Sequence, residues 1–562
     1  MVQVKLPFSP DEANGLCSDP ATCSLLPRLS KGLREACLAN SFLHKYLHWL
    51  PLGEIGIPDY YPKLSRSLRD LEERNLIYPT KDGTLFIHIY PDMKGERDIY
   101  VTIEPCLTVS LENIVPEVES RLLEFADQIG QAETDEEKEK ALLTALDAIV
   151  TTDGRNGSRI QVSPEEYQAL KYRILRDKVG LGLLQPLLLD PYIEDISCAG
   201  VGPIFIEHKI FRSLQCAITF STEEEVDEFV IWLGEWIKRP VTVRNPIVDA
   251  VLPDGSRINI VYGSDISKRG SNFTIRKFSD TPLSVMELIE FGTLDYTMAA
   301  YLSFVLEEGL NVFVVGATAS GKTTLLNAIT TFILPDKKIV TIEDTPELQV
   351  PHKNWVREVT RGTSRDEKGS AVGMFDLLKA ALRQRPDRII VGEIRGEEGA
   401  IAFQAMQTGH GVMSTFHAAS VERLIQRLTG EPINIPKAYV DNLDVVVIQA
   451  AVRAPGRGMV RRVTSINEIV GYDPVNKSFS FIEVFRWNPA NDTFEFPGYM
   501  NSFILEEKIA PKRGIPPFKR KAIYTELKRR AKIFERLHKE KKVKGFNEVF
   551  QVLAEAHRQK LL

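Results

Sequence analysis

Apolar residues recur at different intervals in successive stretches of the chain, and each change of interval predicts a change of structure. Residues 1–112 alternate short apolar runs with Pro and Gly, which favours a small accessory α+β region. Residues 113–180 have helical spacing. Within them, Ser163, Pro164 and Glu166 form a capping box that predicts the start of a helix.

The following stretches predict an α+β domain and then an α/β domain. Residues 181–279 place β-rich runs such as PIFIEH, CAITF and FTIRKF around one helix that starts near Ser221. Residues 280–300 are expected to form a helical linker. Over residues 301–490, apolar strands alternate with helices (NVFVVG, KIVTIED, RIIVGE, GVMSTFH), which is typical of a parallel sheet covered by helices. Residues 491–562 are expected to be a basic helical extension.

The length of the chain agrees with several domains, because 562 residues exceed what one hydrophobic core usually supports. The apolar and charged fractions, 43% and 26%, are close to globular averages, so neither a disordered nor a fibrous protein is indicated. Apolar runs such as Val445–Val452 are only strand-sized, and the N-terminus lacks the features of a signal peptide. We therefore expect a cytoplasmic protein whose membrane contacts are peripheral.

The six cysteines include no C-x-x-C pair, which argues against a disulfide framework and fits a reducing compartment. Cys17, Cys23 and Cys37, with His44 and His48 downstream, allow two interpretations. They could ligate a metal, although their spacing matches no common zinc pattern. Alternatively, the thiols are small buried or exposed residues without a ligand.

The net charge of −6 hides a basic C-terminal segment. Residues 508–562 contain 17 Lys and Arg against 5 Asp and Glu, an excess of +12. Clusters such as Lys519-Arg520-Lys521 could contact anionic lipid or the acidic loops of a membrane protein. The alternative is a solvated helix surface.

The strongest chemical motif is a phosphate-binding loop that fits G-x-x-x-x-G-K-[ST]. It follows an apolar strand and precedes an apolar-periodic helix, so the positive end of the helix dipole would face an anion. Backbone N–H groups would wrap the phosphates, Lys322 would reach the β- and γ-phosphates, and Thr323 would bind Mg²⁺. We therefore expect ATP and Mg²⁺ as cofactors. The predicted nucleotide-binding residues are Gly316, Ala317, Thr318, Ala319, Ser320, Gly321, Lys322, Thr323 and Thr324.

Hydrolysis also needs carboxylates near the terminal phosphate. Glu343 and Asp344 end one predicted strand and Glu393 ends another, which places them at the carboxyl edge of a doubly wound sheet, beside the loop. His410 and His417 follow, seven residues apart. Each histidine is either a structural residue or a contact for the γ-phosphate.

Together these segments resemble the secretion ATPase superfamily of type II secretion, type IV pilus, conjugation and archaellum motors. GATASGKT, IVTIEDTPEL, LLKAALRQRPDRIIVGEIRGEE and AMQTGHGVMSTFHA are similar to its Walker A, Asp box, Walker B and His box, in that order. The similarity covers roughly residues 186–470. It implies a RecA-like P-loop domain preceded by a smaller, PAS-like α+β domain.

The resemblance also implies roles for individual residues. Glu343 would polarise the lytic water, with Lys322 holding the phosphates and Glu393 binding Mg²⁺ through water. His417, and with it His410, would sense the γ-phosphate. Arg257 of LPDGSR and Arg276 of FTIRKF would be arginine fingers that reach a nucleotide across a domain or subunit boundary; the alternative is two surface residues of strands.

The implied assembly is a homo-hexamer that works on a polytopic membrane platform protein, with a hinge at Phe278–Pro282 between the two domains. Two departures from common patterns matter, of which the first is shared by the family. Gly392 stands where many P-loop proteins have an apolar residue before the acidic one, and the tetracysteine zinc motif of many bacterial relatives is missing. The missing motif favours the archaeal branch.

Two rival functions stay open at this stage. One is a nucleic-acid-dependent P-loop motor that uses the basic tail, although no nucleic acid is expected because the body is acidic and carries no recognition motif. The other is a scaffold that binds ATP without turnover. Pilus extension, archaellum rotation, adhesin export and filament retraction are equally compatible with the motifs.

Overall fold

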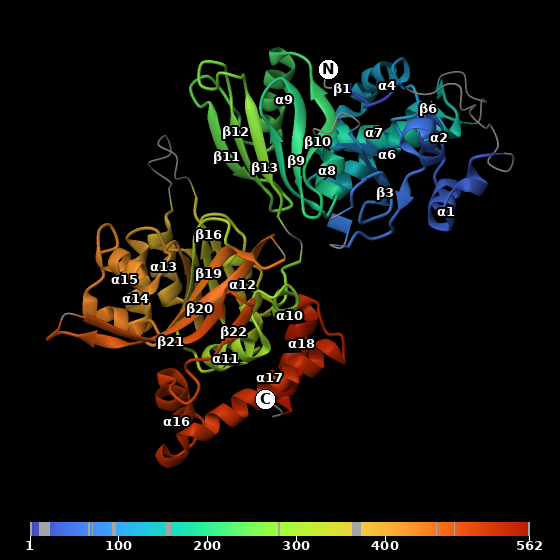
Figure 1. Cartoon of the computed structure of the whole chain (residues 1–562). Helices are drawn as coiled ribbons and strands as arrows, with labels where there is room; N and C mark the ends of the chain where they lie inside the picture. Colours follow the sequence, from blue (N-terminus) through green and yellow to red (C-terminus); the bar gives the residue numbers. More distant parts are fainter. Residues whose placement is uncertain are drawn as a thin grey trace. The chain divides into compact units, whose positions relative to one another are not determined.

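The computed structural model describes residues 3–9, 23–65, 68–69, 71–92, 97–152, 159–278, 281–361, 372–456, 458–476 and 478–559 (Figure 1). The chain divides into two compact units, Met1–Phe278 and Ser279–Leu562, and each is treated by itself. Cys17 and two residues of the expected hinge, 279 and 280, lie outside the described residues.

The first unit is built on one mixed sheet. Its strands are β1 Gln3–Val4, β2 Asp59–Tyr60, β3 Leu76–Pro79, β4 Phe86–Tyr90, β5 Ile99–Ile103, β8 Ile193–Cys198, β9 Gly202–His208, β10 Arg212–Phe220, β11 Ile247–Val251, β12 Arg257–Val261 and β13 Asn272–Arg276. Among the described residues they form eleven strands in the order β11-β12-β13-β8-β9-β10-β5-β4-β3-β2, with β1 paired to β10.

The accessory region and the α+β domain, expected as separate parts, share this sheet. β10 pairs with β5 in parallel, with Gln215 opposite Ile99 and Cys216 opposite Tyr100. The pairing occupies backbone groups that would otherwise form an exposed sheet edge. A contact between strands more than 100 residues apart has no local sequence signal, so the pattern of apolar residues did not reveal it.

Helices cover this sheet and build a separate helical layer beside it. They are α1 Lys31–Ala39, α2 Ser41–Trp49, α3 Leu52–Ile55, α4 Ile114–Leu122, α5 Ala126–Gly130, α6 Asp135–Ile149, α7 Pro164–Lys178, α8 Gln185–Leu189 and α9 Glu223–Trp236, and the short strands β6 Val150–Thr151 and β7 Ile160–Gln161 pair with each other. Helices α1 and α2 pack on β3–β5, and α9 packs on β8–β13. The capping box is confirmed, since Ser163 and Glu166 exchange side-chain and backbone hydrogen bonds at the start of α7.

The second unit is an α/β domain, which confirms the predicted fold class. Its strands are β14 Val312–Val315, β15 Ile339–Glu343, β16 Trp355–Val359, β17 Arg388–Glu393, β18 Gly411–Phe416, β19 Val445–Ala454, β20 Gly458–Asp473, β21 Ser478–Asn488 and β22 Thr493–Glu495. In the described part of the chain they form one sheet in the order β16-β15-β17-β18-β14-β19-β20-β21-β22. The first six strands in this order run parallel, and β20–β22 are antiparallel.

Both faces of this sheet are covered by helices, as parallel sheets require. The helices are α10 Val285–Glu290, α11 Tyr296–Glu307, α12 Lys322–Ile329, α13 Met374–Arg383, α14 Glu398–Gln407, α15 Val421–Thr429, α16 Ala510–Lys512, α17 Ile523–Lys539 and α18 Phe546–Arg558. Figure 1 shows α13, α14 and α15 grouped on one side of the sheet, where they share one core, while α11, α12 and α17 share another.

Two segments differ from the sequence-based expectations. Residues 285–300, expected as a linker, form α10 and the start of α11, because their apolar side chains belong to the main core of this unit. The C-terminal extension is also part of that core: the ring of Phe534 on α17 stacks on Phe332 with a centroid distance of 5.6 Å. None of the described helices is long and apolar enough to cross a membrane.

Candidate functional site

The loop between β14 and α12 has a backbone that only small residues permit. A Cβ on Gly316 would lie 2.1 Å from the carbonyl oxygen of Gln449, and Gly321 has φ +93°, in the left-handed region. Gly321 is also the N-cap of α12, and no side chain caps the helix there. The first N–H groups of α12 are therefore directed into the loop without a side-chain acceptor, which is the arrangement that binds phosphate.

The side chains of the loop fit a phosphate as well. Ser320 Oγ is buried and has no hydrogen-bond partner among the described residues, so it has a free donor inside the loop. Residues 317–319 are exposed, which leaves the loop open to solvent. Thr323 and Thr324 are half-buried in the first turn of α12, where a hydroxyl could reach a metal ion beside the phosphates.

Lys322 connects the loop to the ends of the neighbouring strands. It is 7% exposed, and its Nζ donates to the carbonyl oxygen of Ala317 at 2.9 Å and to Nδ1 of His417 at 3.4 Å. Burial lowers the pKa of this ammonium, while Glu393 acts in the opposite direction. Because an ammonium can only donate, His417 Nδ1 must accept, which leaves the proton of a neutral His417 ring on Nε2.

That Nε2 atom lies close to a carboxylate. Glu393, the last residue of β17, has its Oε1 2.7 Å from His417 Nε2, a close contact in which the two atoms do not form a hydrogen bond, and its Oε2 accepts from Arg395. Burial lowers the pKa of His417, which favours the neutral ring. A line of polar side chains therefore runs from the phosphate loop across the carboxyl ends of β18 and β17, in the order Lys322, His417, Glu393.

Glu343 ends β15 and lies further along the same edge, because β17 and β18 stand between β15 and β14. Its Oε1 accepts the backbone N–H groups of Glu347 and Leu348, at 2.8 and 2.9 Å, and its Oε2 is buried without a hydrogen-bond partner among the described residues. Burial raises its pKa to about 7, against the effect of these N–H groups and of Arg357.

The loop after Glu343 returns to the phosphate-loop helix. The backbone N–H of Gln349 donates to Asn327 Oδ1 on α12 at 3.1 Å, and Glu347 is close enough to influence the pKa of Lys322. A Cβ on Gly392 would lie 3.2 Å from Glu343 Cγ, so this glycine lets the ends of β15 and β17 approach. Asp344, also a sequence candidate, accepts a hydrogen bond from Thr360 Oγ1 at 3.2 Å.

His410 is not part of this constellation, which corrects the hypothesis that it contacts the phosphate. It directly precedes β18, whereas His417 directly follows it, so the two residues lie at opposite edges of the sheet. A six-residue strand spans about 20 Å. The ring of His410 instead forms a hydrogen bond with Thr408 Oγ1 at 3.0 Å.

The two arginine candidates belong to the first unit and are direct neighbours there. Arg257 on β12 is paired with Arg276 on β13, so both side chains stand on the same face of the sheet, and both are exposed. Arg257 lies 3.8 Å from Asp249, and Arg276 is opposite Asp195 on β8.

Three further residues of the site were not among the residues predicted from the sequence. Arg461 on β20 donates through Nε to the carbonyl oxygen of Ala319 at 3.3 Å. Gln449 on β19 is 1% exposed and forms the wall behind Gly316 and Gly321. Arg395 pairs with Glu393. Arg395 could have been found because it stands two residues after the predicted carboxylate, but Arg461 and Gln449 reach the loop only through the folding of the sheet.

Comparisons with known proteins show which proteins this chain is similar to. The family model described as "Type II/IV secretion system protein" matches residues 177–466. An uncharacterized protein of Methanocaldococcus jannaschii is 44% identical over 521 residues, which cover 90% of this chain and 93% of that protein. The type IV secretion system protein PtlH of Bordetella pertussis is 34% identical over 262 residues, 41% of this chain and 76% of that protein. The solved structure of the pilus retraction motor PilT with bound ADP aligns at 20% identity over 61% of this chain and 93% of that chain, with a TM-score of 0.37.

Proposed function

This chain belongs to the type II/IV secretion system protein family, and from that premise we propose that it hydrolyses MgATP to drive the assembly of a pilus-like filament or archaellum, or type II-like secretion. The observation that carries the proposal is the line from Lys322 through His417 to Glu393 at the carboxyl edge of the sheet. This line places a cation, a ring proton and a carboxylate beside one phosphate-binding loop.

Each residue has a distinct task in this proposal. The N–H groups of 316–323 and Lys322 hold the triphosphate, and His417 reports whether its terminal phosphate is present. Thr323 and Glu393 would hold Mg²⁺, whose chemistry is to neutralise charge on the phosphate oxygens. Glu343 accepts the proton of the attacking water. With a pKa of about 7, a large part of this carboxyl is ionised at neutral pH, as a general base requires.

A second subunit completes the site in this proposal. Arg257 and Arg276 stand opposite each other on an exposed face, and each has one carboxylate nearby, Asp249 and Asp195 respectively. The neighbouring strand β11 exposes Ile247 and Val251, which are 59% and 43% accessible. Guanidinium groups beside exposed apolar side chains fit an interface with another copy, and we propose that they act as arginine fingers within a homo-hexamer.

The proposed membrane contact lies in the C-terminal segment at residues 518–521. Phe518 is 83% exposed and is followed directly by Lys519, Arg520 and Lys521. An exposed aromatic ring among cations fits anionic lipid or a polytopic platform protein at the membrane surface. The other basic cluster, Lys528-Arg529-Arg530, is less suitable, because its Arg530 is buried and paired with Glu307. Arg520 of the first cluster pairs with Glu507 but stays partly exposed.

Steady-state phosphate release by the full chain tests the proposal. Wild-type protein should hydrolyse ATP only with Mg²⁺, and Lys322→Ala should lose nearly all activity. Lys353→Ala, which removes an exposed lysine of the same unit, is the matched control and should retain it. Undetectable hydrolysis by wild-type protein that binds ATP would instead support a scaffold. Stimulation by DNA, but not by anionic vesicles, would support a nucleic-acid motor.

A further inference from the structure

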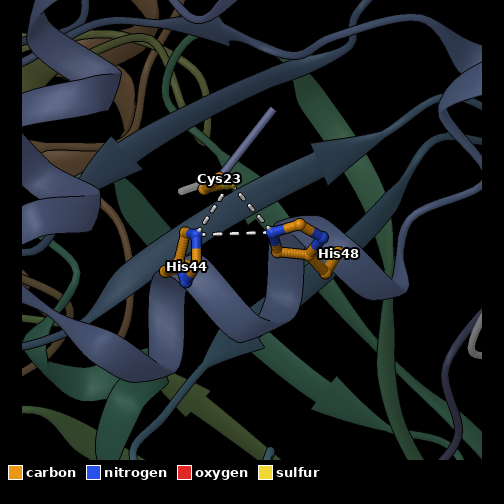
Figure 2. Close-up of side chains that lie close together, drawn as sticks. All are labelled: Cys23, His44 and His48. Carbon is orange, nitrogen blue, oxygen red and sulfur yellow. Dashed lines mark hydrogen bonds between the residues drawn. The ribbon is translucent and has the colours of Figure 1, made fainter. Parts of the chain in front are cut away.

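Three potential metal ligands meet inside the first unit, far in sequence from the phosphate loop. Cys23, His44 and His48 are buried, at 5%, 6% and 3% accessibility. His44 and His48 are one helical turn apart on α2, so both rings project from the same face of the helix. Figure 2 shows Cys23 above this face, with its sulfur directed toward both rings. Within the described part of the chain, no other group of three such residues is as close.

The distances among the three ligand atoms match the edges of a coordination tetrahedron. His44 Nε2 and His48 Nε2 are 3.3 Å apart, and Cys23 Sγ is 3.3 Å from the first and 3.4 Å from the second. Tetrahedral zinc, with Zn–N bonds of about 2.0–2.1 Å and a Zn–S bond of about 2.3 Å, requires edges of about 3.3 Å between nitrogens and about 3.5 Å between nitrogen and sulfur.

Hydrogen bonds alone cannot satisfy this triangle. Each Nε2 carries either one proton or one lone pair in the plane of its ring, so it serves one partner well. Three mutual contacts would require each nitrogen to serve two partners. A cation between the three atoms uses the sulfur and both nitrogen lone pairs at once.

We propose that Cys23 Sγ, His44 Nε2 and His48 Nε2 bind one Zn²⁺ ion. A set of one thiolate and two imidazoles is typical of zinc. On binding, the Cys23 thiol releases its proton to solvent, and the thiolate with two neutral imidazoles leaves one positive charge on the site. The fourth tetrahedral position is taken by water or another ligand.

The ion would have a structural role. Cys23 is 21 residues before His44, and the segment between them includes α1, which packs with α2 on β3–β5. Binding the ion would therefore tie Cys23 to α2, and its binding free energy would stabilise the folded form of this core. The proposed zinc site takes no part in ATP hydrolysis, so a negative result for zinc would not contradict the proposed ATPase activity.

Metal analysis of the full chain tests the proposal. Protein stripped with a chelator, dialysed against Zn²⁺ and then against metal-free buffer should retain about one zinc per chain, a stoichiometry set by a single three-ligand site. Cys23→Ser and His48→Gln should lose this zinc. Cys198→Ser is the matched control, because Cys198 is a buried thiol of β8 outside the cluster, and it should retain the zinc.

Cobalt substitution keeps the test decisive if the variants do not fold. Wild-type protein loaded with Co²⁺ should show the visible bands of tetrahedral cobalt and a thiolate-to-cobalt charge-transfer band, and chelation should lower its melting temperature. Wild-type protein that retains no zinc and gives no such spectrum would overturn the proposal. Folded Cys23→Ser that retains as much zinc as the Cys198→Ser control would overturn it as well.

Discussion

Replacing Glu343 by Gln should make the protein more stable in a way that depends on pH. The folded carboxyl keeps its proton up to about pH 7, whereas the unfolded carboxyl releases it near 4.5. The stability linked to this group is therefore complete below pH 4.5 and is lost as the pH rises through 7. A difference of about 2.5 pKa units corresponds to about 3 kcal/mol, of which about 1 kcal/mol is already lost at pH 5.

Gln cannot ionise, yet its carbonyl oxygen can still accept the N–H groups of Glu347 and Leu348. The free energy of unfolding of Glu343→Gln relative to wild type should therefore increase by about 2 kcal/mol between pH 5 and pH 8.5. Thermal unfolding of the second unit, followed by calorimetry of the full chain, measures this change. Glu540→Gln, an exposed substitution in the same unit, is the control. A stability difference independent of pH would refute the assigned burial of Glu343.

Three other predictions follow from the site and its support. The rate of ATP hydrolysis by Glu343→Gln should be about 10²- to 10⁴-fold lower than that of wild type. The wild-type rate should rise with pH around an apparent pKa near 7, because the base must be ionised, and a rate independent of pH would contradict that role. His417→Asn should lower phosphate release strongly, whereas His410→Asn, at the opposite edge of the sheet, should leave it near the wild-type rate; equal losses would contradict the corrected placement. Arg530→Ala should destabilise the second unit by about 1–3 kcal/mol, because the buried carboxylate of Glu307 loses one of its charged partners but keeps Arg513 and His557. Denaturant unfolding measures this loss, with the exposed substitution Lys532→Ala as control, and no loss of stability would contradict the assigned pairing.

The placement of most candidate residues around the loop between β14 and α12 could be predicted from the sequence, because it depends on local patterns. A glycine-rich turn between a strand and a helix has one geometry, and carboxylates that end parallel strands share one edge of the sheet. This reasoning correctly placed Lys322, Glu393 and His417 together. It failed for His410 because the strand between the two histidines carries them to opposite edges. The six-residue length of that strand was readable, so this error was avoidable.

Other parts of the fold depend on contacts that no local pattern contains. The pairing of β5 with β10 unites two segments that composition separates. Arg461 and Gln449 reach the loop from strands that follow the last motif. Cys23 meets His44 and His48 across 21 residues, a spacing outside the common zinc patterns. In each case the residues are adjacent only after the chain has folded.

The structure of the full chain with Mg²⁺ and a non-hydrolysable ATP analogue tests the central claim most directly. Our account predicts that the N–H groups of 316–323 surround the phosphates, that Lys322 Nζ exchanges the Ala317 carbonyl for a phosphate oxygen, and that His417 and Glu393 lie beside the terminal phosphate. A nucleotide bound elsewhere, or one whose terminal phosphate lies away from Glu393 and His417, would contradict it.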